Sequence, residues 1–166
     1  MTRLVLAAVV LFLWSPAWAE EIRIGFVNVA KVLQQAPQAE QAKKRLEREF
    51  APRDKRLVAM QKELKKLEEK LARDAAVMSD SERRKLERDI LAKQRELKRA
   101  REEFREDFNL RRNEELGKLQ RQVFEAVKSL AKEENYDLLL TDGVVYASDR
   151  VDVTDKVLKR LKALTE

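Results

Sequence analysis

Apolar residues recur every three or four positions through most of this chain, in two long series. The first series steps by four, seven, three, four, three, four and seven residues, which is the a/d spacing of a heptad seam on one long helix. Arg53 and Asp74 replace apolar residues at two of its d positions. The apolar members are Leu46, Phe50, Leu57, Met60, Leu64, Leu67, Leu71 and Met78.

The second series predicts a second long helix, through Leu86, Ile90, Leu97, Phe104, Phe108, Leu116, Leu119, Val123, Val127 and Leu130. Between the two series, Ser79 is followed three residues later by Glu82, which is a capping box and a helix-start signal. Two seams separated by one tight break predict an antiparallel helical hairpin over residues 39–135. Its first arm has about 40 residues and therefore a length of roughly 60 Å.

Outside the hairpin the pattern changes to short strands. Residues 22–27 alternate and are rich in branched side chains, so they predict a strand, and a short helix from Val29 to Gln35 follows. Residues 136–140 and 144–146 flank Thr141-Asp142-Gly143, which is a hairpin turn signal between two strands. Thr154 is the expected cap of a last helix, whose apolar residues are Val157, Leu158, Leu161 and Leu164.

These patterns predict an α+β protein, in which a long antiparallel α-helical hairpin, a coiled-coil tentacle, is inserted into a small β-sheet head. The head comprises residues 20–38 and 136–166. About 50 residues with three short strands are too few to bury a stable core alone, and their sheet edges would be exposed. We therefore expect several heads to associate through their apolar strand positions, which are Ile22, Ile24, Phe26, Leu138, Leu140, Val144 and Tyr146.

Residues 1–19 have the features of a secretory signal peptide. Arg3 supplies a positive charge, and residues 4–13 form an apolar run that is too short for a stable membrane anchor. Ala17-Trp18-Ala19 is a small-x-small cleavage signal, so cleavage is expected after Ala19, with an uncleaved anchor as the alternative. No second apolar stretch reaches membrane length. We therefore expect a soluble mature chain outside the cytoplasm.

Composition narrows the chemistry that the chain can perform. It contains no cysteine and no histidine, which removes thiol nucleophiles, zinc–thiolate sites and the commonest general base. Its three glycines, Gly25, Gly117 and Gly143, are too far apart to form a phosphate-binding loop. Carboxylates alternate with Lys and Arg at helical spacing, as on a solvated helix face. We expect a non-enzymatic protein without a cofactor, a metal or an ATP cycle.

The positive charge of the chain lies on the hairpin. Residues 40–135 carry 28 basic and 22 acidic side chains, whereas the rest of the mature chain carries 7 and 8. A cationic hairpin attracts anionic partners and raises encounter rates at low salt. A nucleic-acid or anionic-surface binder is therefore one alternative, although interspersed acids, few aromatics and export make nucleic acid an unexpected partner. An exported structural coiled-coil spacer is the other.

Pro52 lies inside the first helical pattern, where proline removes a backbone hydrogen bond. Equal distances from the turn at Ser79 place it near Asp107 of the second helix, between Phe104 and Phe108. A static kink filled by aromatic side chains is one interpretation. A hinge at which the hairpin bends is the other.

Several motifs in this order resemble the Skp/OmpH family of periplasmic chaperones. They are the Val27-Asn28-Val29 turn after the first strand, the stretches 111–119 (RRNEELGKL) and 126–131 (AVKSLA), the Tyr-Asp-Leu-Leu-Leu strand and the closing segment 153–159. The resemblance covers the whole mature chain. It implies a homotrimer whose heads share a β core and whose three tentacles enclose a cavity in the periplasm. Unfolded outer-membrane proteins would be held there without nucleotide.

The resemblance also implies a contact with lipopolysaccharide or an anionic membrane surface through basic residues of the returning helix. These residues are here Arg99, Arg101, Arg111 and Arg112, while Ala100 and Leu110 stand at positions where basic residues are expected.

The apolar tip of the hairpin has two interpretations of its own. Ala75, Ala76, Val77 and Met78 either close the last layer between the two arms or offer an adaptable contact for an unfolded chain, since methionine adapts well to irregular partners. Many weak apolar and cationic contacts around one cavity would give affinity through effective concentration and permit release without ATP.

Overall fold

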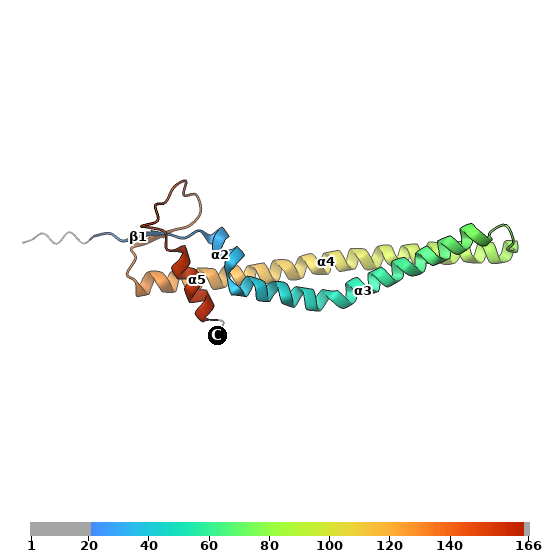
Figure 1. The fold of residues 1–166 in the computed structure, drawn as a ribbon, viewed down its shortest axis with the longest axis horizontal. Helices are drawn as coiled ribbons and strands as arrows, with labels where there is room; N and C mark the ends of the chain where they lie inside the picture. Colours follow the sequence, from blue (N-terminus) through green and yellow to red (C-terminus); the bar gives the residue numbers. More distant parts are fainter. Residues whose placement is uncertain (1–20, 165–166) are drawn as a thin grey trace, which may run out of the picture.

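A computed structural model describes residues 21–164, and the predicted signal peptide lies outside the described residues. The elements in chain order are β1 (Ile24–Phe26), α2 (Val29–Gln35), α3 (Pro37–Asp74), α4 (Asp80–Glu133), β2 (Leu138–Leu140) and α5 (Thr154–Ala163). Figure 1 shows a long hairpin of α3 and α4 that projects from one end of a small head. The predicted α+β class with an inserted helical hairpin is confirmed.

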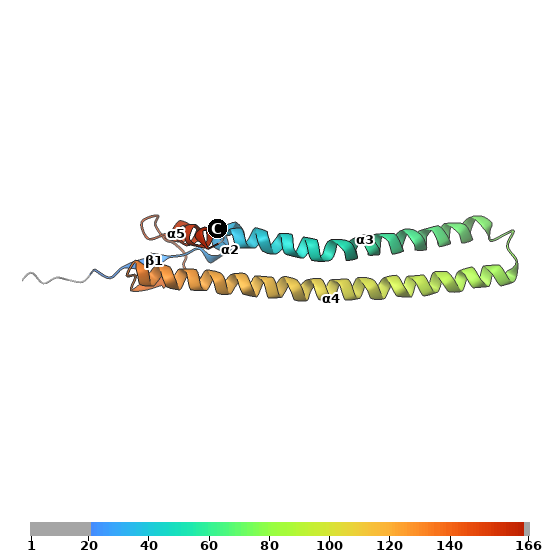
Figure 2. The same cartoon turned by 90° about the horizontal axis from the view of Figure 1, so that it is seen from below.

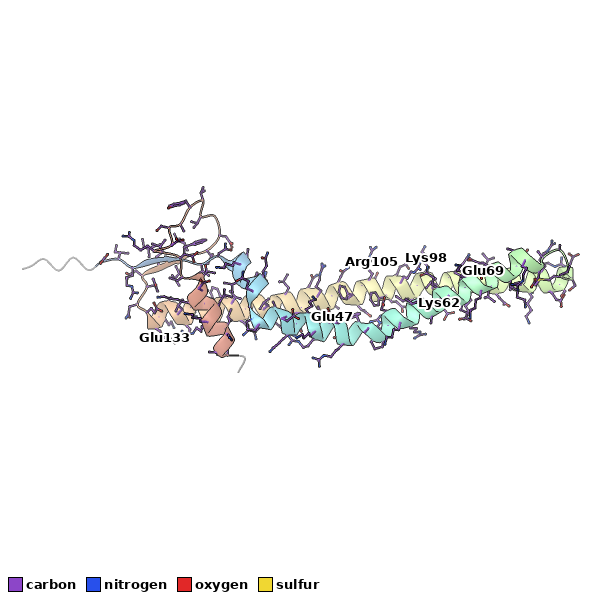
Figure 3. All side chains as sticks on the ribbon, viewed as in Figure 1. Glu47, Lys62, Glu69, Lys98, Arg105 and Glu133 are labelled. Carbon is purple, nitrogen blue, oxygen red and sulfur yellow. The ribbon has the colours of Figure 1, made fainter. Side chains whose placement is uncertain are left out.

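The two heptad seams meet along the hairpin, where α3 and α4 lie side by side (Figure 2). Phe50 of α3 is buried, and the remaining members of its seam are half-buried. Only one stripe of each helix is covered, because a hairpin has only two helices. The other side chains, including Lys62, Glu69, Lys98 and Arg105, project away from the hairpin (Figure 3).

Helices α2, α3 and α4 begin where the sequence signals it. Asn28 caps α2 by accepting a hydrogen bond from the Lys31 N–H at 2.9 Å. Pro37 is the first residue of α3, where its missing N–H costs nothing. Ser79 and Glu82 form the predicted capping box at the start of α4, with Ser79 N–H donating to Glu82 Oε2 at 3.0 Å. The short segment between α3 and α4 is the tip of the hairpin.

The head is built on a parallel pairing of β1 with β2, with Ile24 opposite Leu138 and Phe26 opposite Leu140. Its core contains residues from both ends of the chain and from the last turns of α4. The buried members are Val27, Val32, Ala36, Leu119, Val123, Ala126, Leu130, Val153, Val157 and Leu161. The head and the hairpin therefore share α4, and this helix supplies core that the two terminal segments lack.

The predicted strand at Val144–Tyr146 is wrong. Residues 144–146 lie in a loop, after a turn in which Gly143 adopts a positive φ of 80°. One edge of β1 pairs with β2, and the other edge is taken by a later segment: Phe26 N–H donates to the Val151 carbonyl, and Val153 N–H donates to the Phe26 carbonyl. No edge of β1 remains within the described chain for Val144–Tyr146.

The start of α5 also differs from the prediction by one residue. Val153 is its N-cap, and Thr154 is its first residue. Asp152 Oδ1 accepts the Thr154 N–H at 2.8 Å, while Thr154 Oγ1 accepts the Asn28 N–H at 2.9 Å. The threonine hydroxyl thus links α5 to the segment before α2 rather than capping its own helix.

Candidate functional site

One face of the β1–β2 pair is apolar and exposed. Since side chains alternate along strands, Ile24 and Leu138 share one face with Phe26 and Leu140. Ile24 is 45% exposed and Leu138 is 46% exposed. An exposed apolar patch on a small protein usually marks an interaction surface. We call these four residues the sheet face.

The opposite face of the sheet packs against the head. Leu139 contacts the core, and a Cβ at Gly25 would lie 2.5 Å from Leu139 Cδ2. Glycine at this position therefore leaves room for the Leu139 side chain. Three predicted interface positions lie outside this face. Ile22 is exposed before β1. Val144 is half-buried and Tyr146 is exposed, and both lie on the loop after β2 rather than in the sheet.

The tip of the hairpin brings Ala75, Ala76, Val77 and Met78 together, as predicted. Their loop is closed by hydrogen bonds from Val77 N–H and Met78 N–H to the Asp74 carbonyl, at 3.0 and 3.1 Å. Met78 and Ala75 are half-buried, whereas Val77 is 86% exposed. The tip thus both closes the hairpin and presents Ala76 and Val77 outward.

An aromatic cluster stands beside Pro52, which lies inside the continuous helix α3. The Phe50 ring meets Phe104 and Phe108 edge-on, with ring centroids 5.5 and 5.2 Å apart. Arg53 forms an ion pair with Asp107 at 2.8 Å. The predicted register between Pro52 and Asp107 is confirmed, and the ribbon of α3 changes direction near its middle in Figure 1.

The four arginines of the predicted anionic site do not gather at one place. Arg99 and Arg101 lie three turns of α4 before Arg111 and Arg112, about 18 Å along the axis at 1.5 Å per residue. Arg101 donates to Gln61 Oε1 at 2.8 Å. Arg111 pairs with Glu49 and Glu114, and its hydrogen bonds to these two carboxylates raise its pKa above the usual value.

A buried carboxylate was missed by the sequence analysis. The heptad pattern predicts Leu116 in the seam of α4, but Leu116 is 44% exposed, and the neighbouring Glu115 is 5% exposed. Glu115 accepts hydrogen bonds from Arg45 of α3 and from Lys118. The sequence signal for this buried position is that Glu115 stands seven residues after Phe108 and four before Leu119, which is the spacing of the seam.

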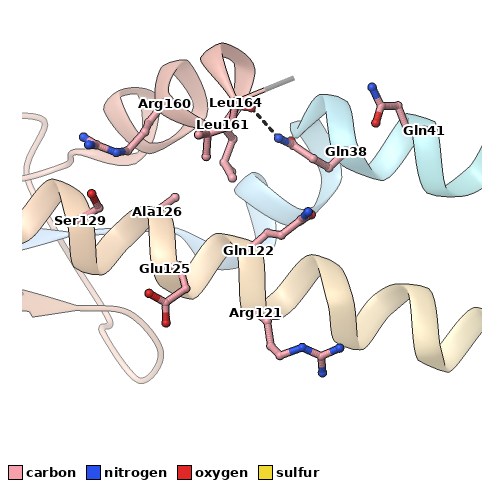
Figure 4. A pocket seen from close by; sticks show the side chains of 10 residues that line it. All are labelled: Gln38, Gln41, Arg121, Gln122, Glu125, Ala126, Ser129, Arg160, Leu161 and Leu164. Carbon is pink, nitrogen blue, oxygen red and sulfur yellow. Dashed lines mark hydrogen bonds between the residues drawn. The ribbon is translucent and has the colours of Figure 1, made fainter. Parts of the chain in front are cut away.

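A groove of about 660 Å³ lies where α3, α4 and α5 meet (Figure 4). Its walls carry three amides and two arginines, Arg121 and Arg160, above an apolar floor of Ala126 and Leu161. Gln38 Nε2 donates to the Leu161 carbonyl across one end of the groove, at 2.5 Å. No predicted site residue lines it.

Within residues 21–164, no group of three acidic, histidine or cysteine side chains is placed to hold a metal ion. None of the helices in the described part of the chain combines the length and hydropathy needed to cross a membrane.

Comparison with known proteins gives consistent matches over nearly the whole chain. The family described as Outer membrane protein (OmpH-like) matches residues 23–161. The Chaperone protein Skp of Yersinia enterocolitica is 34% identical over 157 residues, which are 94% of this chain and 96% of that protein. The Chaperone protein Skp of Yersinia pestis is 45% identical over 141 residues, covering 84% and 86%.

A solved structure shows the same fold. It is an OmpH-like chain from Caulobacter crescentus CB15, which superposes with a TM-score of 0.77 at 13% identity and covers 87% of this chain and 86% of its own.

Proposed function

The chain belongs to the OmpH-like outer membrane protein family, and we propose that it acts in the periplasm as an ATP-independent holdase for unfolded outer-membrane proteins. Its relatives over at least 84% of its length carry the name Chaperone protein Skp. The observation that carries the proposal is the hairpin. Two helices of 38 and 54 residues project from the head with most of their side chains exposed and with an excess of basic charge.

Such a hairpin is suited to holding rather than to catalysis. Its surface offers many charged groups of both signs and a few apolar ones, each of which binds an unfolded chain weakly. Several hairpins around one space raise the effective concentration of these contacts, so the client is retained although no single contact is strong. Because each contact is weak, the client stays mobile and leaves when a stronger acceptor is present.

Several hairpins require several chains, and we propose a homotrimer assembled through the sheet face. Ile24, Leu138 and Leu140 are each more than 40% exposed in the single chain, although they belong to strands of the head. Covering them in a shared β core would remove apolar area from water at about 25 cal/mol per Å². Association at this end leaves the hairpin tips free.

The tip is the proposed first contact with the client. Val77 is almost fully exposed at the point of the hairpin farthest from the head, and Met78 beside it is adaptable.

The experiment that tests the function is the dilution of a urea-denatured outer-membrane protein into buffer with or without the mature chain, residues 20–166. The holdase predicts that light scattering is suppressed at a stoichiometric amount of chaperone, without nucleotide. A structural spacer predicts scattering equal to buffer alone. The control client is a folded soluble protein with a net charge similar to that of the outer-membrane protein. It should not bind to the mature chain.

A further inference from the structure

A second face of α4 is uncharged over the four turns that adjoin the head. Leu110, Gly117 and Phe124 follow one another at intervals of seven residues, so they line up along one side of the helix. Leu110 is 59% exposed and Phe124 is 64% exposed. Asn113 and Gln120 stand between them. In a chain with 40% charged residues, five consecutive uncharged heptad positions form a distinct stripe.

The stripe is separate from the seam that packs against α3. At 100° per residue, its centre lies roughly a third of a turn from Leu119 and Val123, which are buried. Helix α4 therefore has apolar residues on two faces, whereas one face is sufficient for a helix with one partner. The second face has no partner among residues 21–164.

Gly117 points to a close neighbour on this face. Glycine within a helix costs about 1 kcal/mol relative to alanine. Nothing in the described chain requires it, because a Cβ at Gly117 would meet only the Arg121 guanidinium at 3.5 Å. A residue without a side chain in the centre of an apolar stripe lets a second backbone approach the helix there.

The stripe has a limit on the side toward the tip. There the same side of α4 carries Arg95, Arg99 and Glu106. A partner element would therefore contact only the turns nearest to the head. Chains that are joined at their heads and diverge toward their tips would meet in this way.

We propose that the stripe from Leu110 to Phe124 packs against the same stripe of a second copy of this chain. The proposal rests on the association through the heads proposed above, and it extends that contact along the first four turns of the hairpin. In an assembly joined at the heads the α4 helices run parallel, so each glycine lies level with the glycine of its neighbour. The cavity between the hairpins then begins beyond Leu110.

The spacing of the stripe fits a second copy better than an unfolded client. Leu110, Gly117 and Phe124 recur every seven residues, and a parallel copy of α4 presents the same spacing at the same level. An unfolded chain has no fixed seven-residue spacing to match, and it gives no reason for a glycine.

Single cysteines test this contact directly, because the chain has none of its own. Phe124→Cys and Leu110→Cys are made in the mature chain, with Arg99→Cys as the control on the same side nearer the tip. Gln122→Cys is the control at the same level on another side. Under mild oxidation the two stripe variants should form disulfide-linked dimers about tenfold faster than both controls, because a disulfide needs Cα atoms within about 7 Å.

The molar mass of the assembly, determined by light scattering, and the holdase activity are measured on the same samples. One outcome is that all four variants assemble and hold the client, yet form disulfide-linked dimers at the same rate. In that case the stripe contact is wrong and the proposed function stands. A monomeric mass would overturn both proposals. If a fluorophore at position 124 is exposed until denatured client is added, the stripe is a client surface, and this inference is also wrong.

Discussion

The guanidinium of Arg45 on α3 donates two hydrogen bonds to Glu115 Oε2 on α4, at 3.0 and 2.5 Å. Lys118 Nζ donates to the other oxygen at 2.9 Å. Glu115 is the one buried ionisable group among residues 21–164. The hydrogen bond from Lys118, followed by that from Arg45, lowers the pKa of Glu115 below its ordinary 4.5. The pair fixes the register of the two helices next to the head.

Glu115→Gln should destabilise the chain at neutral pH by about 2 kcal/mol, since it removes charge-assisted hydrogen bonds from a buried site. The pKa of Glu115 is lower in the folded chain than in the unfolded chain. Its stabilisation is therefore complete above pH 4.5 and is lost as the pH falls through the lowered pKa. Urea unfolding at pH 7 and at pH 3 should show that the difference between variant and wild type shrinks in acid.

The exposed Glu47, which pairs with Lys43 within α3, is the control for that experiment. Glu47→Gln should change stability little at either pH, because exposed ion pairs contribute little. A Glu115→Gln penalty of the same size at pH 7 and pH 3 would show that packing, rather than charge, is responsible.

Leu138→Asp should dissociate the proposed trimer. The substitution places a charge in the centre of the sheet face, where burial of an unpaired charge costs several kcal/mol. Val58→Asp is the matched control, because Val58 has almost the same exposure, 45% against 46%, but lies on the hairpin. Sedimentation velocity should give a smaller species for Leu138→Asp alone. Wild-type sedimentation of Leu138→Asp would remove the sheet face from the interface.

Client association should slow as salt rises, because the positive excess lies on the hairpin. Screening shortens the range of charge interactions to about 8 Å at physiological ionic strength. Stopped-flow mixing with a labelled client should show an association rate that falls by roughly tenfold between low and high salt. A rate that does not depend on salt would leave the apolar contacts as the sole attraction.

Pro52→Ala should stiffen the hairpin if Pro52 is a hinge. The proline removes one backbone hydrogen bond within α3, and the Phe50 cluster beside it is held by edge-on ring contacts that tolerate small rotations. Spin labels at Ala76→Cys near Met78 would report the tip-to-tip distances in the assembly. The hinge predicts a narrower distribution in Pro52→Ala. An unchanged distribution would establish a static kink.

The long elements were predictable because each has its own periodic signal. The seams of α3 and α4, the capping box at Ser79 and the register that places Pro52 opposite Asp107 all follow from local spacing and one turn. Neither Val144–Tyr146 nor Thr154 has such a signal. Their structures depend on which segment reaches the free edge of β1, and that contact joins opposite ends of the chain.

Glu115 shows a different limit. An apolar pattern identifies Leu116 as the buried position, because it assigns every carboxylate to solvent. Glu115 stands seven residues after Phe108 and four before Leu119, at a buried position of α4. Arg45 and Lys118 satisfy both of its oxygens there, so the carboxylate can be buried. The contact between Arg45 and Glu115 joins residues that are 70 positions apart. The apolar pattern of a single sequence does not indicate which basic residue faces the carboxylate.

The pairing of Ile24 with Leu138 joins residues 114 positions apart, so it sets the order in which the protein can fold. The hairpin can assemble from its tip through neighbouring segments, whereas closing the sheet requires both chain ends. During synthesis β1 emerges first, and it pairs only after residues 138–140 have followed. The apolar sheet face therefore forms late, when both strands are present.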